Sequence, residues 1–348
     1  MPTLSQATSI TKKVAIFGGG GILLAILLFF LSKGAVSLYS SLFPKPGPAP
    51  EAAFNALPPL VFPESVTQEK FKYSLDTVSG NLGEFPDRLK VYKTVVSEPN
   101  LLSLQSTQSL VAKTSFTFNR TKLNDTTYAW NEVVRPEKRL TVNIVSKDFS
   151  IDSNFLTYPD LAANGRVNEE NAKNEVTEFL SLLGLFPSDI DILQTNVDLL
   201  KLEDEKLVAA LTPSDAQIAR IDLYQSDLDK FQIVYPNPPH TTMHFIVGGA
   251  NTRELMEASF NHQTISNESS TYPLISVNDA YSLLKKNGAY VGSYFGSSTD
   301  IVIKKVYLGY YLGVAKQEYV MPVFVFEGKD GFSAYVSAVK SEWINKAN

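Results

Sequence analysis

A strongly apolar run of 19 residues without a charge, Val14 to Ser32, constrains this chain more than any other feature of its sequence. A helix rises about 1.5 Å per residue, so the run is long enough to reach across the roughly 30 Å hydrocarbon core of a bilayer. No other stretch of the sequence is as apolar over a comparable length. We therefore expect a single transmembrane helix over residues 14–32, preceded by a tail over residues 1–13.

A cleaved signal peptide is the alternative interpretation, because Ala35 and Ser37 are small residues that suit a cleavage site. The apolar run exceeds the usual ~7–15 residues of a signal core. Lys33 also interrupts the approach to the site, so a retained anchor is favoured. The glycines at 18–21 either pack the helix closely against another or are simply tolerated there. They do not form a dinucleotide-binding loop, because Leu23 stands where that motif needs glycine.

Charge is distributed unevenly along the chain. The first 50 residues contain four lysines and no acid, which leaves 27 basic and 36 acidic residues for the remainder, a net charge of −9. Anionic membranes repel such an acidic body, and it lacks the basic surface of a nucleic-acid-binding protein. We expect a single-pass protein of the cell membrane with its C-terminal body extracytoplasmic. Lysines on both sides of the apolar run leave its orientation open on charge alone.

The prolines that alternate with other residues from 44 to 50 predict an extended, semi-rigid spacer. Later prolines prolong it, so we place a Pro-rich linker at residues 33–66. The body beyond it is predicted to contain an N-terminal α+β domain over residues 67–165, a second α+β unit over residues 166–270 and a C-terminal α+β unit over residues 271–348.

Two helices carry the clearest periodicity in the body. The first follows Asn168, a good N-cap residue, and ends before Gly184. Its apolar face has helical spacing and consists of Ala172, Val176, Phe179, Leu180 and Leu183. The second is expected over Ser276–Asn287. Strand-like segments follow each helix, which predicts an α+β fold with helices laid on one face of an antiparallel sheet.

The C-terminal strands carry a family resemblance. They read VYLGYY over 306–311, YVMPVFVFEG over 319–328 and AYVSA over 334–338. Over about residues 170–340, this pattern resembles YycI/YycH-type regulatory proteins, whose layout is PepSY-like. Ser337 departs from the asparagine that often precedes the last alanine in that group. The resemblance implies a membrane-anchored, extracytoplasmic, non-enzymatic module that restrains sensor kinases or proteases by contact, and it carries over no catalytic residues.

The sequence offers little chemistry. His240 and His244 have the spacing of a helical metal site, but in the strand predicted there they would stand about 13 Å apart. Asp189 and Asp191 suit Ca²⁺ or, more simply, a solvated turn. His262 lies in a polar turn. The common phosphate-binding, serine-hydrolase and zinc-protease motifs are missing. We therefore expect no enzymatic activity, catalytic residue, cofactor, metal or small-molecule substrate.

An aromatic stripe in the last strands allows two interpretations. Its members are either cross-strand core packing or an interaction face, since tyrosine often anchors protein interfaces. The residues proposed for such a face are Tyr307, Tyr310, Tyr311, Phe324 and Phe326.

Together, these features predict a bacterial, membrane-anchored protein-binding module with a regulatory or sensory role that contacts another envelope protein. The alternative is a structural subunit of a cell-envelope or secretion assembly.

Overall fold

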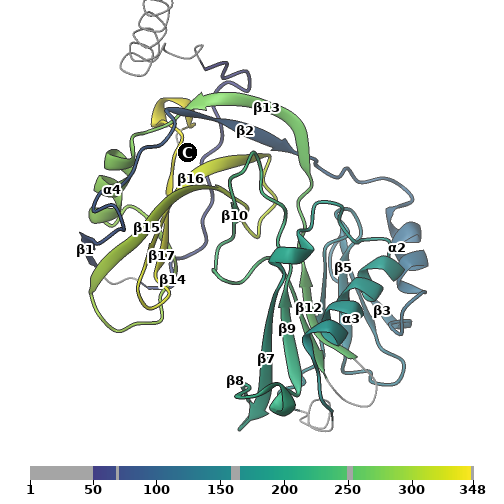
Figure 1. The fold of residues 1–348 in the computed structure, drawn as a ribbon. Coiled ribbons are helices and arrows are strands. Elements are labelled where there is room, and N and C mark those ends of the chain that lie inside the picture. Colours follow the sequence, from purple (N-terminus) through teal and green to yellow (C-terminus); the bar gives the residue numbers. More distant parts are fainter. Residues whose placement is uncertain (1–49, 68–69, 158–164, 249–253, 346–348) are drawn as a thin grey trace, which may run out of the picture. The chain divides into compact units, whose positions relative to one another are not determined.

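The computed structural model describes residues 50–67, 70–157, 165–248 and 254–345, and all of them belong to one compact unit that begins at Pro50. Its strands form two large sheets (Figure 1). Of the described residues, 39% lie in strands and only 14% are helical. The predicted α+β fold of helix-on-sheet units is therefore wrong, because sheet dominates and its pairings join strands far apart in the sequence.

The transmembrane part of that prediction concerns residues 14–32, which lie outside the described residues. Among the helices that are described, none combines the length and the apolar character needed to cross a membrane.

The first sheet has nine strands in the order β3-β4-β5-β6-β12-β11-β9-β7-β8, and every described pairing in it is antiparallel. Its strands are β3 (Phe118–Lys122), β4 (Thr127–Asn131), β5 (Arg139–Asn143), β6 (Phe149–Asp152), β7 (Asn196–Glu203), β8 (Lys206–Ala209), β9 (Ile218–Asp222), β11 (Met243–Gly248) and β12 (Glu254–Phe260).

The second sheet has eight strands and a backbone of β1-β15-β16-β17-β14. The short strand β10 pairs with β15, while β2 pairs with both β13 and β16. Its strands are β1 (Lys72–Leu75), β2 (Arg88–Thr94), β10 (Ile233–Val234), β13 (Ile265–Pro273), β14 (Tyr290–Ser293), β15 (Asp300–Tyr311), β16 (Tyr319–Gly328) and β17 (Ser333–Ser337).

The α-helices of the described residues are α2 (Ser103–Val111), α3 (Glu169–Leu182) and α4 (Val277–Lys285), with short 3₁₀ turns η2 (Ile192–Gln194), η3 (Pro213–Asp215) and η4 (Ser341–Trp343). The Asn168 side chain accepts from the amide of Asn171 and caps α3, as its sequence predicts. Ser276 caps α4 in the same way. Helix α3 packs on the nine-stranded sheet and α4 on the eight-stranded sheet, each through its buried apolar stripe.

The strands are grouped differently from the predicted domains. β1 and β2, from the predicted first domain 67–165, lie in the eight-stranded sheet, while β3 to β6 lie in the other. The chain changes sheet after β2, after β9, after β10 and after β12. Local pattern does not reveal this arrangement, because β2 pairs with residues such as Ile265, far along the chain.

Strand β16 is apolar on both faces, as its sequence suggests, and both faces are covered. Phe324 and Phe326 belong to the cluster beneath α4. Val323 and Val325 lie on the opposite side with Tyr335. That second cluster is joined by Leu60 and Phe62, residues of the predicted spacer. The protein therefore covers this strand with its own N-terminal segment.

Residues 50–66 are thus part of the fold, contrary to the predicted linker at 33–66; residues 33–49 lie outside the described residues. Leu57 is fully buried, and its amide donates to the carbonyl of Trp343 over 2.8 Å. The Phe62 ring stacks on Tyr290 with ring centres 5.1 Å apart. Proline content indicated an extended segment but did not show that the segment packs.

Substitution tests this anchoring. We expect Leu57→Ala to reduce the free energy of unfolding by about 2–5 kcal/mol, because it empties a fully buried site. The matched control is Val61→Ala, whose side chain is 68% exposed and which should change stability by less than about 0.5 kcal/mol. Chemical denaturation of both variants measures the difference. Equal, small effects would mean that residues 50–66 behave as a spacer.

Candidate functional site

The predicted interaction face lies mostly in the core. Tyr310, Tyr311, Phe324 and Phe326 are fully buried and belong to three different clusters. Tyr307 is half-buried, and its hydroxyl donates to Glu327 over 2.6 Å. These side chains therefore do not form one exposed surface, and their placement fits the core interpretation of the stripe.

The histidine at position 240 meets a carboxylate cluster at the end of β9. Its Nδ1 lies 3.2 Å from Asp222, and the ligand atoms of Asp198, Asp222 and His240 lie within 4.8 Å of one another. Arg220 supplies the positive charge at this cluster, because its Nε donates to the buried Asp222 over 2.9 Å. With His244, His240 lines a cavity of about 210 Å³. A paired arginine makes this cluster an ion-pair site more readily than a metal site.

A cavity with a volume of about 500 Å³ lies between the two sheets. We call it the inter-sheet cleft. Segments of both sheets line it: the end of β2 and the start of β13 from one, and the β5–β6 turn and the end of β12 from the other. The loop after α3 and the β15–β16 turn complete it. Its lining residues are Thr94 to Ser97, Ser146 to Asp148, Gly184 to Asp189, Phe260, His262 to Ile265, Lys316 and Gln317.

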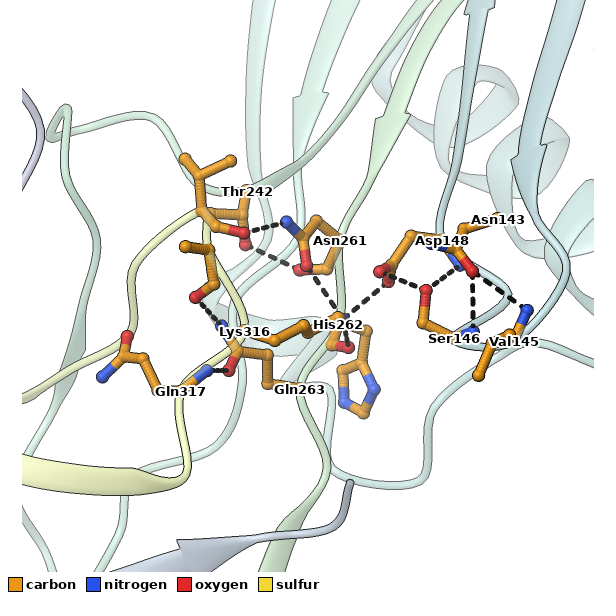
Figure 2. A network of polar contacts seen from close by, with 12 residues as sticks. Asn143, Val145, Ser146, Asp148, Thr242, Asn261, His262, Gln263, Lys316 and Gln317 are labelled. Atoms are coloured by element: carbon orange, nitrogen blue, oxygen red, sulfur yellow. Dashed lines mark hydrogen bonds and ion pairs between the residues drawn. The ribbon is translucent and has the colours of Figure 1, made fainter. Parts of the chain in front are cut away.

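A single lysine joins the two sides of the cleft (Figure 2). Lys316, in the β15–β16 turn, donates to Asp148 over 2.8 Å, to the side-chain oxygen of Asn261 over 3.0 Å and to the carbonyl of His262 over 2.7 Å. An ammonium group has three protons, so all of its donor capacity is used. Because the Lys316 side chain is 43% exposed, the ion pair itself contributes little, about 0–1 kcal/mol.

Gln263 holds the same turn from the segment between β12 and β13. Its Nε2 donates to the carbonyl of Gly313 over 2.9 Å, and its Oε1 accepts from the amide of Gln317 over 2.9 Å. The side chain is almost completely buried. Asn261 also donates to the carbonyl of Val314. The turn is therefore fixed by directional bonds to both main-chain and side-chain groups, as Figure 2 shows for Lys316 and Gln317.

A second group of polar side chains, centred on Asp189, also lines the cleft. His262 Nε2 lies 2.8 Å from Asp189, and the His262 ring stacks on Phe260. Gln225 donates to the other Asp189 oxygen over 2.8 Å. Burial raises the pKa of Asp189, but the hydrogen bond and charge of His262, together with the Gln225 hydrogen bond, outweigh it. The net pKa of this carboxyl therefore lies below its usual 3.8.

Lys147 faces the cleft beside Asp148 but bonds only to neutral oxygens, including Thr107 Oγ1 over 2.6 Å and the Ile144 carbonyl over 2.8 Å. Burial lowers the pKa of its ammonium group. These bonds tie the β5–β6 turn to helix α2, so the position of Lys147 is explained by the fold.

The chemistry available in the cleft is limited because its charged side chains are already engaged in hydrogen bonds within the fold. A Ser–His–Asp site would need a serine hydroxyl on His262. No described serine makes that bond, and Ser146 donates to Asp148 instead. The main chain from Val96 to Glu98, by contrast, has no hydrogen-bond partner among the described residues. The cleft thus suits recognition through its backbone and apolar rim.

Sequence reasoning placed Asp189 and His262 in solvated turns and did not single out Lys316, Asp148 or Gln225. Their partners are remote: Lys316 and Asp148 are 168 positions apart. Nothing in the local pattern of either residue indicates that pairing.

Comparison with known proteins gives no family. No protein-family model and no curated protein matches the chain. An uncharacterized protein from Eubacterium rectale ATCC 33656 aligns with a TM-score of 0.40 and 12% identity, covering 79% of this chain and 90% of that chain. The YpeB C-terminal domain of Bacillus megaterium aligns with a TM-score of 0.33 and 9% identity, covering 73% and 97%.

Both alignments are weak in sequence identity and in TM-score. Neither structure is named as a YycI- or YycH-type protein. TM-scores this low establish no shared fold, so the resemblance to that group stays a prediction.

The Asp189 pair makes stability depend on pH. Because the folded pKa is below 3.8, the pair stabilises the fold fully above the unfolded pKa and loses this effect as pH falls through the lower folded value. We expect Asp189→Asn to cost about 1 kcal/mol at neutral pH, since the partly exposed charge is screened, and the cost to shrink as pH falls through the lowered pKa of the folded carboxyl.

Denaturation of wild type and variant across this pH range measures the effect. Asp227→Asn is the matched control, because Asp227 is exposed on a neighbouring loop and should show no such dependence. A cost for Asp189→Asn that stays constant with pH would contradict the assignment.

Proposed function

We propose that residues 50–348 form a non-enzymatic protein-binding module with a regulatory or sensory role, and that the inter-sheet cleft receives a segment of another envelope protein. The resemblance of residues 170–340 to YycI/YycH-type regulatory proteins supports the regulatory role. It is a resemblance of sequence pattern and not an assignment.

One observation carries the proposal: the charged side chains of the cleft already have hydrogen-bond partners within the fold. Catalysis requires a nucleophile or a proton-transfer group that is free to reach substrate. Lys316 and Asp148 neutralise each other, as do His262 and Asp189 when the histidine is protonated. What the cleft still offers a ligand is unpaired main chain and exposed apolar side chains such as Val96, which is 66% exposed. These features suit binding a polypeptide.

Affinity capture with the full chain tests the proposal. Val96→Asp places a charge on the cleft rim without disturbing the core, so we expect it to reduce capture of the physiological partner about tenfold or more. Val78→Asp is the matched control, because Val78 is fully exposed and does not line the cleft. Mass spectrometry compares the captured proteins.

The expected result is a partner that is retained by wild type and Val78→Asp but lost with Val96→Asp. Equal capture by all three chains would contradict binding in the cleft. A stoichiometric ring or filament in detergent would instead favour the structural-subunit alternative.

Location at the cell membrane, with residues 50–348 extracytoplasmic, is proposed from the sequence alone. It rests on the apolar run at 14–32, which lies outside the described residues. Protease added to intact cells is expected to degrade the chain beyond about residue 44, because the acidic body would be accessible. Immunoblotting with an antibody against the body measures this, and full protection of the body would exclude the proposed side.

A further inference from the structure

Strand β2 ends at Thr94, and the chain continues from it along the mouth of the cleft. Its ladder with β13 ends at Thr94, opposite Ile265. On the other side, the Thr94 amide donates to the carbonyl of Glu318 over 2.9 Å. Val95 makes the last main-chain hydrogen bond to a neighbouring segment: its amide donates to the carbonyl of Thr264 over 2.8 Å.

The chain continues past Val95 without partners. On the β13 side, the side chain of Gln263 bonds to the β15–β16 turn and not to this stretch. On the β16 side, the β15–β16 turn separates from β2 at Gln317. The N–H and C=O groups of Val96, Ser97 and Glu98 accordingly bond to none of the described residues.

This unpaired stretch is nevertheless held at both ends. Pro99 favours an extended conformation for Glu98, the residue before it. Two residues later, the Asn100 side chain accepts from the amide of Leu102 and its backbone amide donates to Ser103, which fixes the start of α2. The main chain of this stretch therefore presents donors and acceptors from a position defined by β2 and α2.

We propose that an extended, largely uncharged segment of a partner protein adds to Val96–Glu98 as a strand at the mouth of the inter-sheet cleft. This rests on the proposed function and specifies how binding occurs. Main-chain hydrogen bonds supply affinity in strand addition, and side-chain contacts supply selectivity. Val96 is 66% exposed, so apolar residues at alternate positions of the partner, which share one face of its strand, can bury it.

The charges of the cleft favour this occupant over a charged small molecule. Lys316 is paired with Asp148, Lys147 bonds to neutral oxygens of the fold, and both lysines already have their hydrogen-bond capacity filled. A phosphate or carboxylate ligand would have to break those bonds. A peptide backbone needs only the unpaired groups of Val96–Glu98.

The test uses the full chain and a displayed library of random short peptides. We expect selected peptides to be poor in charge and to carry apolar residues at alternate positions. Ser97→Pro removes one main-chain donor and should weaken their binding about tenfold, whereas Ser97→Ala keeps the donor and should bind as wild type. Hydrogen exchange of wild type, free and with peptide, is measured at the Val96, Ser97 and Glu98 amides. It should slow about tenfold or more at those that face the added strand, because successive amides of an extended chain point to opposite sides.

The outcomes separate the two proposals. Peptides that bind the cleft while these amides exchange unchanged, and while Ser97→Pro binds as wild type, would overturn strand addition and leave cleft binding intact. The wild-type chain is expected to capture a partner that Val96→Asp loses. If no selected peptide competes with that capture, both cleft binding and strand addition are overturned. Because the exchange measurement uses the wild-type chain, it decides the question even if Ser97→Pro does not fold.

Discussion

Burial of strand β16 on both faces is the constraint on which the rest of this structure depends. A strand with phenylalanines on one side and valines on the other cannot face water on either side without a large cost. Helix α4 covers the first face. The second is covered by Val234 of β10 and by Leu60 and Phe62 near the start of the described chain. These covering elements come from distant parts of the sequence. The chain also passes between the sheets four times, and the passages after β2 and after β12 line the cleft.

The two sheets keep separate hydrophobic cores. The cluster under α3 draws on strands such as β9 and β11 of the nine-stranded sheet, while the cluster under α4 belongs to the eight-stranded one. The described contacts at the cleft are instead polar: Lys316 with Asp148, Gln263 with the β15–β16 turn, and Gln225 with Asp189. Hydrogen bonds fix geometry but contribute modestly to stability. The relation between the sheets is thus defined by direction-sensitive bonds at a surface where a ligand can reach them.

Sequence reasoning succeeded where the determining interactions are local. The caps at Asn168 and Ser276 and the two apolar faces of β16 all depend on residues within a few positions of one another, and the structure confirms them. It failed where partners are remote. The balance between helix and sheet was misjudged, the segment containing Leu57 was assigned to a spacer, and the first predicted domain was not divided between sheets. The cleft could not be predicted for the same reason, because residues such as Lys316 and Asp148 are joined only by the tertiary fold.

The pairing of β2 with β13 and β16 also has a consequence for synthesis on the ribosome. Thr94 finds its partner at Ile265, and Lys93 finds its partner at Tyr319. β2 therefore leaves the ribosome long before either neighbour exists, and contacts of this sequence separation slow folding. Until the C-terminal strands appear, the apolar side of β2 and both of its edges lack their native cover, the condition under which strands associate wrongly. The native cover of β2 is therefore complete only once β16 has been synthesised.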